Sequence, residues 1–188
     1  MKLLAGVDEV GRGPVAGPVV AAAVILKEDH QISGLRDSKT LSSLRRGELV
    51  RDIKKGSIAW NIGIVSSKKI DRINILQSSL LAMKKAIEGL NTKPEFILVD
   101  GIYLPKTNIP GRAIIKGDAK CESIMAASIV AKNYRDNLMI ELSKKYKNYS
   151  FQLNKGYLTK VHLEAIKKYG PCKEHRISFR PIKDKEYK

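Results

Sequence analysis

One apolar run constrains the fold of this chain more than any other feature. Residues 18–26 read PVVAAAVIL, without a charged side chain and directly after a glycine-rich stretch. A short run of apolar and β-branched residues is typical of a buried strand. Similar patterns predict further strands at residues 3–7, 58–65, 95–99 and 113–115.

Helical patterns separate these predicted strands. Residues 73–90 carry apolar side chains at helical spacing. Residues 121–142 predict one long helix, in which several alanines would allow close packing of the backbone against a neighbour. Shorter helices are expected at residues 42–55 and 160–169. Strands that alternate with helices in this way predict an α/β fold in layers.

Positive charge is concentrated toward the end of the chain. The formal net charge is +16, and residues 144–188 hold thirteen Lys and Arg against four Asp and Glu, together with five of the seven tyrosines. Cations interleaved with aromatic rings suit phosphate contact combined with stacking on sugars or bases. The charge therefore favours nucleic acid as the partner, and a merely solvated basic surface is the alternative.

Cysteine content and hydropathy bear on the cellular compartment. Cys121 and Cys172 are the only cysteines, too few and too far apart for a metal cluster or a disulfide scaffold. The N-terminal apolar run is short and meets two acids, unlike a signal peptide. No apolar stretch approaches the roughly eighteen residues of a membrane span. We therefore expect a cytoplasmic protein with reduced thiols and no membrane association.

Four acids occupy positions that suit metal binding. Asp8 and Glu9 follow the first apolar run, Asp100 ends another, and Asp118 precedes the long helix. Ligand sites in open α/β sheets form at the carboxyl ends of strands, so these acids are candidates to converge. Carboxylates suit hard cations such as Mg²⁺ or Mn²⁺, and two such ions promote phosphodiester hydrolysis. The alternative is that each acid merely caps a turn or helix.

A family resemblance strengthens the metal-site hypothesis. Residues 6–18, GVDEVGRGPVAGP, closely resemble the opening motif of bacterial ribonuclease HII, of the type 2 ribonuclease H family. Further motifs follow in the family's order, and the similarity spans essentially the whole chain. These motifs are DSKTL at 37–41, VDG at 99–101, KGD at 116–118, AASIVAK at 126–132, RD at 135–136, KGY at 155–157, TK at 159–160 with His162, GP at 170–171, HR at 175–176 and SF at 178–179.

The resemblance implies a particular architecture. It is a ribonuclease H-like α/β fold with a central mixed five-stranded sheet flanked by helices, plus a helical C-terminal extension that closes over the substrate. We expect the catalytic core at residues 1–143 and the basic extension at residues 144–188, within a single compact unit.

The resemblance also assigns roles to residues near the N-terminus. The family's metal ligands correspond to Asp8, Glu9, Asp100 and Asp118, which would hold two Mg²⁺ or Mn²⁺ ions. The family's motif that senses the ribose 2′-hydroxyl corresponds to Gly11, Arg12 and Gly13. Glycine allows the backbone to approach a sugar closely, and the 2′-hydroxyl distinguishes RNA from DNA.

Further substrate contacts are expected along the rest of the chain. Tyr157 matches the family tyrosine that stacks on the deoxyribose beyond the ribonucleotide. For His162 and His175 we expect structural or phosphate-binding roles, and for Asp136 a structural role such as a salt bridge. The candidate phosphate contacts are Lys39, Arg46, Ser128, Lys132, Lys160 and Arg176.

The implied activity is that of an endoribonuclease. It would hydrolyse the RNA strand of RNA–DNA hybrids and incise on the 5′ side of single ribonucleotides in duplex DNA, as ribonucleotide excision repair requires. We expect a monomer. A ribonuclease HIII-like enzyme is one alternative, against which stand the Gly11-Arg12-Gly13 motif and the lack of an extra N-terminal domain in this sequence. A catalytically inactive hybrid-binding protein and a basic helix-rich DNA-binding module are the others.

Overall fold

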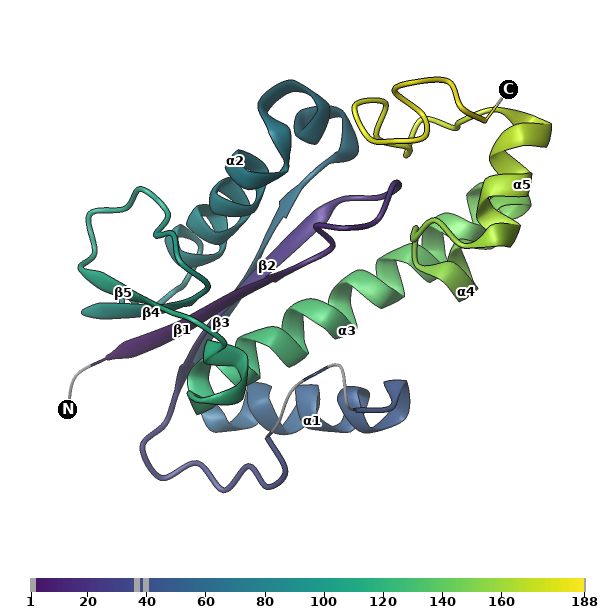
Figure 1. Cartoon of the computed structure of the whole chain (residues 1–188). Coiled ribbons are helices and arrows are strands. Elements are labelled where there is room, and N and C mark those ends of the chain that lie inside the picture. Colours follow the sequence, from purple (N-terminus) through teal and green to yellow (C-terminus); the bar gives the residue numbers. More distant parts are fainter. Residues whose placement is uncertain (1–2, 36–37, 39–40, 188) are drawn as a thin grey trace.

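A single mixed sheet forms the centre of the molecule (Figure 1). The structure is a computed structural model that describes residues 3–35, 38 and 41–187. The strand order is β3-β2-β1-β4-β5; β1 is antiparallel to β2 and parallel to β4, so it lies in the middle of the sheet. The predicted five-stranded mixed sheet is therefore confirmed. The strands are β1 (Leu4–Val10), β2 (Val19–Leu26), β3 (Ser57–Val65), β4 (Phe96–Asp100) and β5 (Gly111–Ile114).

Helices cover both faces of this sheet. α2 (Ser67–Glu88) packs on one face, where Ala21 and Ala23 of β2 contribute to the core. α1 (Ser43–Gly56) and α3 (Glu122–Lys145) lie on the other face, over Ala22 and Val24 (Figure 1). Because successive strand residues point to opposite faces, a strand covered on both sides must be apolar throughout. This explains the uninterrupted apolar sequence of β2.

The first turn of α3 lies directly on β1. A side chain at Gly6 would collide with the backbone of Ser123 and Ile124, so only glycine permits this approach. Ala126 and Ala127 are fully buried in the same interface region. The close packing brings the segment just before α3 next to the strand that carries Asp8.

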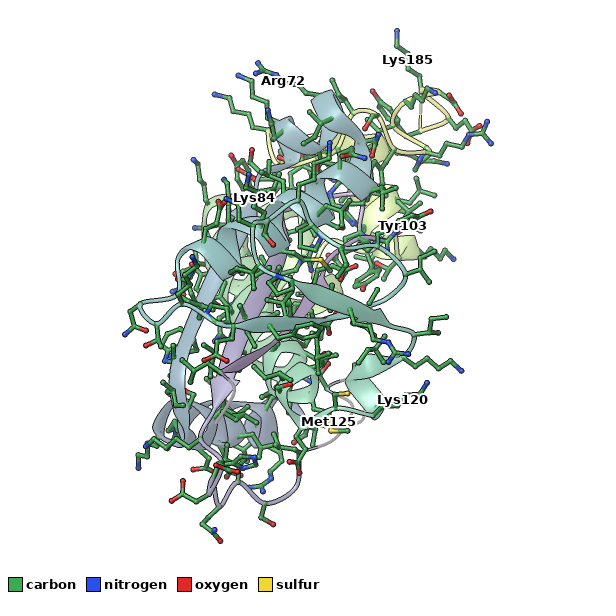
Figure 2. All side chains as sticks on the ribbon, turned by 90° about the vertical axis from the view of Figure 1, so that its left-hand side faces the viewer. Arg72, Lys84, Tyr103, Lys120, Met125 and Lys185 are labelled. Atoms are coloured by element: carbon green, nitrogen blue, oxygen red, sulfur yellow. The ribbon has the colours of Figure 1, made fainter. Side chains whose placement is uncertain are left out.

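The C-terminal part forms a third core against α3 and residues 15–16. Its buried residues include Val15, Met139, Phe151 and Ile166. α3 continues to Lys145, so the expected boundary at residue 143 lies within this helix. Figure 2 shows Lys185 of the tail pointing away from the protein. No helix in the described part of the chain is long and apolar enough to cross a membrane. The remaining elements are η1 (Gly117–Ala119), η2 (Lys147–Tyr149), α4 (Phe151–Asn154) and α5 (Lys160–Tyr169).

The start of α2 differs from the sequence prediction. The helix begins at Ser67 rather than residue 73, with the Ser66 hydroxyl accepting a hydrogen bond from the Lys69 amide. Asn74 has φ 63° and ψ 170° and kinks the helix. Residues 67–73 carry apolar side chains only at Ile70 and Ile73, too few to show a helical spacing, so the first turns were not predicted.

Candidate active site

Three acids from separate segments converge beside the centre of the sheet. Asp8 lies in β1, Asp100 ends the adjacent parallel strand β4, and Asp118 lies in η1. One carboxylate oxygen from each lies within 4.8 Å of the others. We call these three residues the acidic cluster. Carboxylates this close repel one another unless a cation lies between them.

The fourth predicted acid, Glu9, lies beside this cluster rather than within it. Its carboxylate is 3.3 Å from Nη1 of Arg12, and it lines the same cavity. The strand was predicted to end at the acids, but β1 continues to Val10, which pairs with Val20, so the predicted end was wrong. The pairing with β2 fixes the backbone on both sides of Asp8.

Burial and like charge both disfavour ionisation at this site. Burial raises the pKa of Asp8 well above its usual value, and the negative charges of Glu9 and Asp100 raise it further. Burial also raises the pKa of Glu9, although the Arg12 guanidinium counteracts the shift. A bound divalent cation would reverse these effects. The donor set of carboxylate oxygens therefore fits a hard metal ion.

Hydrogen bonds hold two of the carboxylates in place. The Glu9 amide donates to Oδ1 of Asp8, and the Gly117 amide donates to Oδ1 of Asp100, each over 2.7 Å. A hydrogen bond from Ser128 lowers the pKa of Asp8, partly offsetting its burial. The Ser128 hydroxyl is also 2.9 Å from that of Ser38. Ser128, predicted as a phosphate contact, thus also orients a carboxylate.

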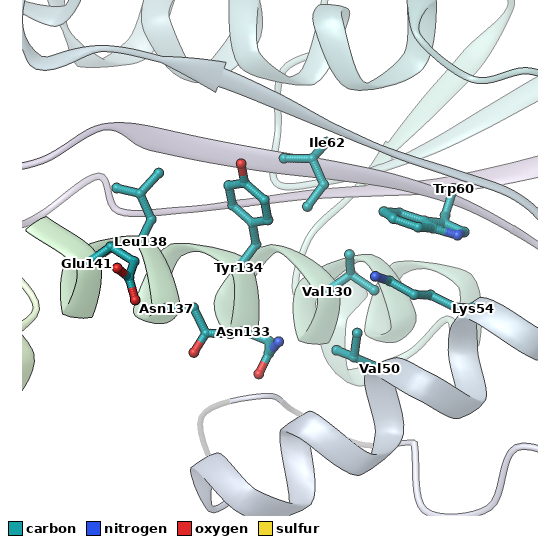
Figure 3. Close-up of a pocket in the computed structure, with 10 residues that line it drawn as sticks. All are labelled: Val50, Lys54, Trp60, Ile62, Val130, Asn133, Tyr134, Asn137, Leu138 and Glu141. Carbon is teal, nitrogen blue, oxygen red and sulfur yellow. The ribbon is translucent and has the colours of Figure 1, made fainter.

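The acids lie in a cavity of about 300 Å³. A larger groove of about 520 Å³ lies elsewhere, between α1, α3 and β3 (Figure 3). Lys54 lies over the Trp60 ring in that groove, and among the described residues that line it Glu141 is the one acid. The chemistry of a metal site therefore belongs to the smaller cavity. Its lining residues are Asp8, Glu9, Val10, Ser38, Asp100, Asp118, Ser128, Lys132 and Tyr157.

The predicted ribose-sensing loop faces Tyr157. Gly11 has φ +93°, and a side chain there would collide with the Arg135 side chain, so both the conformation and the space require glycine. A Cβ atom at Gly13 would lie 3.6 Å from the Tyr157 ring. Tyr157 is 45% exposed. The loop therefore lies beside this ring, which also lines the cavity of the acids.

Two buried arginines, which we call the arginine clamp, hold this loop from behind. Arg176 donates hydrogen bonds to the carbonyls of Gly11, Arg12 and Gly17 over 2.6 to 3.0 Å. Arg135 donates to three other backbone carbonyls over 2.9 to 3.1 Å. Burial lowers the pKa of Arg135 to about 10 and that of Arg176 to about 9, so both remain charged at neutral pH. The carbonyls bound by Arg135 belong to Ala16, Pro18 and Lys155.

This placement bears on two expectations from the sequence. The Arg176 guanidinium is buried, so it lies behind the loop rather than at an open surface. Its predicted phosphate contact stays a prediction. Arg135 was not among the predicted site residues; the Arg135-Asp136 motif was the available signal.

The other candidate phosphate contacts lie in different settings. Arg46 is buried and bonds to the carbonyls of Ser38 and Leu41 and to Asp136. Lys132 lies 2.8 Å from Asp136 and lines the cavity. Lys160 is exposed at the start of α5. Asp136 therefore has the expected salt-bridge role. Lys39 lies outside the described residues.

Comparisons with known proteins show the family of this chain. The family model described as Ribonuclease HII matches residues 5–182. The chain belongs to the ribonuclease HII family. A ribonuclease HII from Caldicellulosiruptor bescii is 52% identical over 178 residues, 95% of this chain and 86% of that protein. One from Bacillus thuringiensis is 56% identical over 181 residues, 96% of this chain and 70% of that protein.

Structural comparison gives a ribonuclease H with the same fold. The crystal structure of ribonuclease H2 from Pyrococcus horikoshii matches with a TM-score of 0.78 and 29% identity, over 98% of this chain and 96% of that one. The ribonuclease H-like fold is thus confirmed. Family membership makes the chain a ribonuclease H, an endonuclease that acts on nucleic acid. Ribonucleases H depend on divalent metal ions, and the acidic cluster is compatible with metal binding.

Proposed function

We propose that this enzyme incises duplex DNA on the 5′ side of an embedded ribonucleotide and cleaves the RNA strand of RNA–DNA hybrids, using two Mg²⁺ or Mn²⁺ ions. The observation that carries the proposal is the acidic cluster, whose three oxygens lie within 4.8 Å of one another. It shares a cavity with Tyr157, which faces the Gly11–Gly13 loop.

The acids would hold the metal ions. Asp8, Asp100 and Asp118 supply one shared oxygen cage, and Glu9 adds a fourth carboxylate from the same cavity. Metal ions bound there would supply the activation of water and the stabilisation of the leaving oxygen. The amides of Glu9 and Gly117 fix two of the ligands before any metal arrives, which lowers the cost of organising the site.

The loop and Tyr157 would select the sugar. The Gly11–Gly13 loop directly follows Glu9 and Val10 in the chain, and its Arg12 and Gly13 are exposed, so a ribose 2′-hydroxyl would meet the backbone at these two residues. The exposed ring of Tyr157 offers a flat apolar surface to the following deoxyribose. Together they would place a DNA–RNA junction over the acidic cluster.

Basic residues would bind the flanking phosphates. Lys132 lines the cavity, and Lys160 is exposed on α5. We assign further phosphate contacts to Lys39, Arg46, Ser128 and Arg176, of which the last three also bind protein groups. We propose that residues 144–188 act as the substrate-binding extension of a catalytic core at residues 1–143, in a monomeric cytoplasmic enzyme of ribonucleotide excision repair.

A defined duplex tests this function. One DNA strand carries a single ribonucleotide, and incision is measured with Mg²⁺, with Mn²⁺ and with EDTA. We expect metal-dependent incision just 5′ of the ribonucleotide, which Asp100→Asn abolishes. Asp52→Asn, at an exposed position of α1, is the matched control and should cleave normally.

Two other results would contradict the proposal. Tight binding without incision under either metal would indicate a catalytically inactive hybrid-binding protein. Cleavage only within several consecutive ribonucleotides would contradict the roles given to the Gly11–Gly13 loop and Tyr157.

A further inference from the structure

Two histidines form a buried contact behind Tyr157. His162 lies in the first turn of α5, and His175 lies in the tail that follows this helix. Their Nε2 atoms are 3.0 Å apart, and the two residues are 0% and 2% exposed. The rings of Tyr149 and Phe151 pack around them. The reaction proposed above uses neither histidine.

The hydrogen bonds fix the tautomer of each ring. Nδ1 of His162 is 2.8 Å from the Tyr157 carbonyl, which only accepts, so this nitrogen carries a proton. Nδ1 of His175 accepts from the Cys172 amide over 2.9 Å, so it carries none. The Nε2–H of a neutral His175 therefore donates to the bare Nε2 of a neutral His162. The result is a directed chain from the Cys172 amide to the Tyr157 carbonyl.

Both ends of this chain lie in segments that hold the ribose-sensing loop. The Gly156 carbonyl accepts from the amides of Val15 and Ala16, and the Glu174 carbonyl accepts from the amide of Gly17. The residue after His175 is Arg176, which binds the carbonyls of Gly11 and Arg12. The histidine pair thus links the backbone of Tyr157 to the segment that holds the Gly11–Gly13 loop.

We propose that His162 and His175 are positioning residues that set the distance between the Tyr157 ring and the Gly11–Gly13 loop, and through it the preference for a ribonucleotide followed by DNA. This inference rests on the proposed function. It concerns substrate preference rather than bond cleavage, because neither histidine lines the cavity that holds the acids.

Kinetics on two substrates test the positioning role. We expect His175→Ala to lower kcat/KM about tenfold on a duplex with a single ribonucleotide, and less than about twofold on a continuous RNA–DNA hybrid, since small misplacements weaken only contacts made at the junction. In a Tyr157→Ala background the same change should have almost no further effect, because the two residues act through one contact. His175→Gln keeps a donor near the Nε2 position and should restore most of the lost preference.

Hydrogen exchange supplies a readout that does not depend on activity. The amides of residues 156–159 should exchange about tenfold faster in His175→Ala than in the parent, because the local structure opens more readily. His30→Ala is the matched control. Its ring contacts Glu122 instead, and the substitution should change neither exchange in this segment nor substrate preference.

The outcomes separate this inference from the proposed function. Failure of the parent enzyme to incise at a single ribonucleotide would contradict the proposed function. If the parent incises normally, equal losses on both substrates, or losses that add to those of Tyr157→Ala, would overturn the positioning role. Unchanged exchange at residues 156–159 in His175→Ala would overturn it as well.

Discussion

The acidic cluster and the arginine clamp are both charged and buried, but their buried charges are compensated by different groups. Each guanidinium of the clamp donates to three different backbone carbonyls, which are neutral and fixed in direction. The carboxylates of the cluster face one another, and burial together with neighbouring negative charge raises the pKa of Asp8. The clamp is satisfied by the protein alone, whereas the cluster is built to be completed by a cation.

This difference separates stability from activity. Residues of the clamp hold segments that are far apart in the sequence, so their loss should destabilise the fold. Residues of the cluster impose an electrostatic cost on the folded protein, so their loss should remove activity and leave the fold intact or more stable.

Of the variants that test this difference between cluster and clamp, Asp118→Asn should have the largest effect. Asp118→Asn removes one negative oxygen from the group within 4.8 Å and should lower kcat about a thousandfold, equivalent to roughly 4 kcal/mol of barrier. Binding of a ribonucleotide-containing duplex in EDTA, measured by fluorescence anisotropy, should be unchanged or tighter. Turnover at the wild-type rate in this variant would contradict the role of Asp118 as a metal ligand.

Arg135 should dominate stability. Arg135→Lys leaves a single ammonium in place of a fork that binds the carbonyls of Ala16, Pro18 and Lys155. Unpaired buried carbonyls should lower the free energy of unfolding by about 3 kcal/mol in urea denaturation. Arg51→Lys, at an exposed position of α1, is the control and should change it little. If both variants lowered the free energy of unfolding equally, the arginine clamp would stabilise the fold no more than an exposed arginine does.

The histidine pair should make the fold sensitive to acid. The pKa of His175 is lowered from 6.5 to about 4 by burial and by His162, so the unfolded chain binds a proton more readily than the folded one. The contribution of the neutral His175 ring to the free energy of unfolding is fully present above pH 6.5, and it is lost as the pH falls from 6.5 toward 4. The loss should reach about 3 kcal/mol.

The carboxyl groups require a matched comparison in this experiment. The raised pKa of Asp8 acts in the opposite direction, because the folded protein takes up that proton more readily. The effect of His175 is therefore the difference between the parent and His175→Gln, measured by urea denaturation from pH 7 to 4. If the free energy of unfolding changed with pH equally in the two proteins, His175 would not have the lowered pKa described here.

The smallest expected effect is an increase in stability, in the variant Asp8→Asn. Asp8→Asn removes a buried carboxyl whose raised pKa shows that its ionised form destabilises the metal-free protein at neutral pH. We expect it to raise stability by about 1 kcal/mol and Tm by roughly 2–4 °C in EDTA. The parent should gain stability on addition of Mn²⁺, and the variant should lose most of that gain. If Asp8→Asn had a lower Tm than the parent in EDTA, Asp8 would stabilise the metal-free protein, contrary to this prediction.

The acidic cluster and the sheet could be predicted because their signals are local. The apolar runs of β2, β3 and β4 give nearly the observed bounds, the run in β1 gives the start of that strand, and Asp8 and Asp100 directly follow such runs. The helix over residues 160–169 was predicted with its observed bounds, and the structure adds the Thr159 cap, whose hydroxyl accepts a hydrogen bond from the His162 amide. These features depend on residues within one turn or one strand.

The clamp and the histidine pair could not be predicted in the same way. Arg135 binds the carbonyls of residues 117 and 119 positions away, and any residue type supplies a carbonyl, so the sequence carries no sign of the partner. His162 and His175 are only 13 positions apart, but their contact depends on the turn between them and on the third core. Tertiary packing decides these contacts.

The hydrogen bond between Arg176 and Gly17 joins residues 159 positions apart. A ribosome makes the chain from its N-terminus, so Asp8, Asp100 and Asp118 all exist well before Arg176 and His175 do. The three acids are therefore synthesised before the residues that hold the neighbouring loop in place. Of the parts proposed to select the substrate, the Gly11–Gly13 loop is synthesised early, whereas Tyr157 follows all three acids.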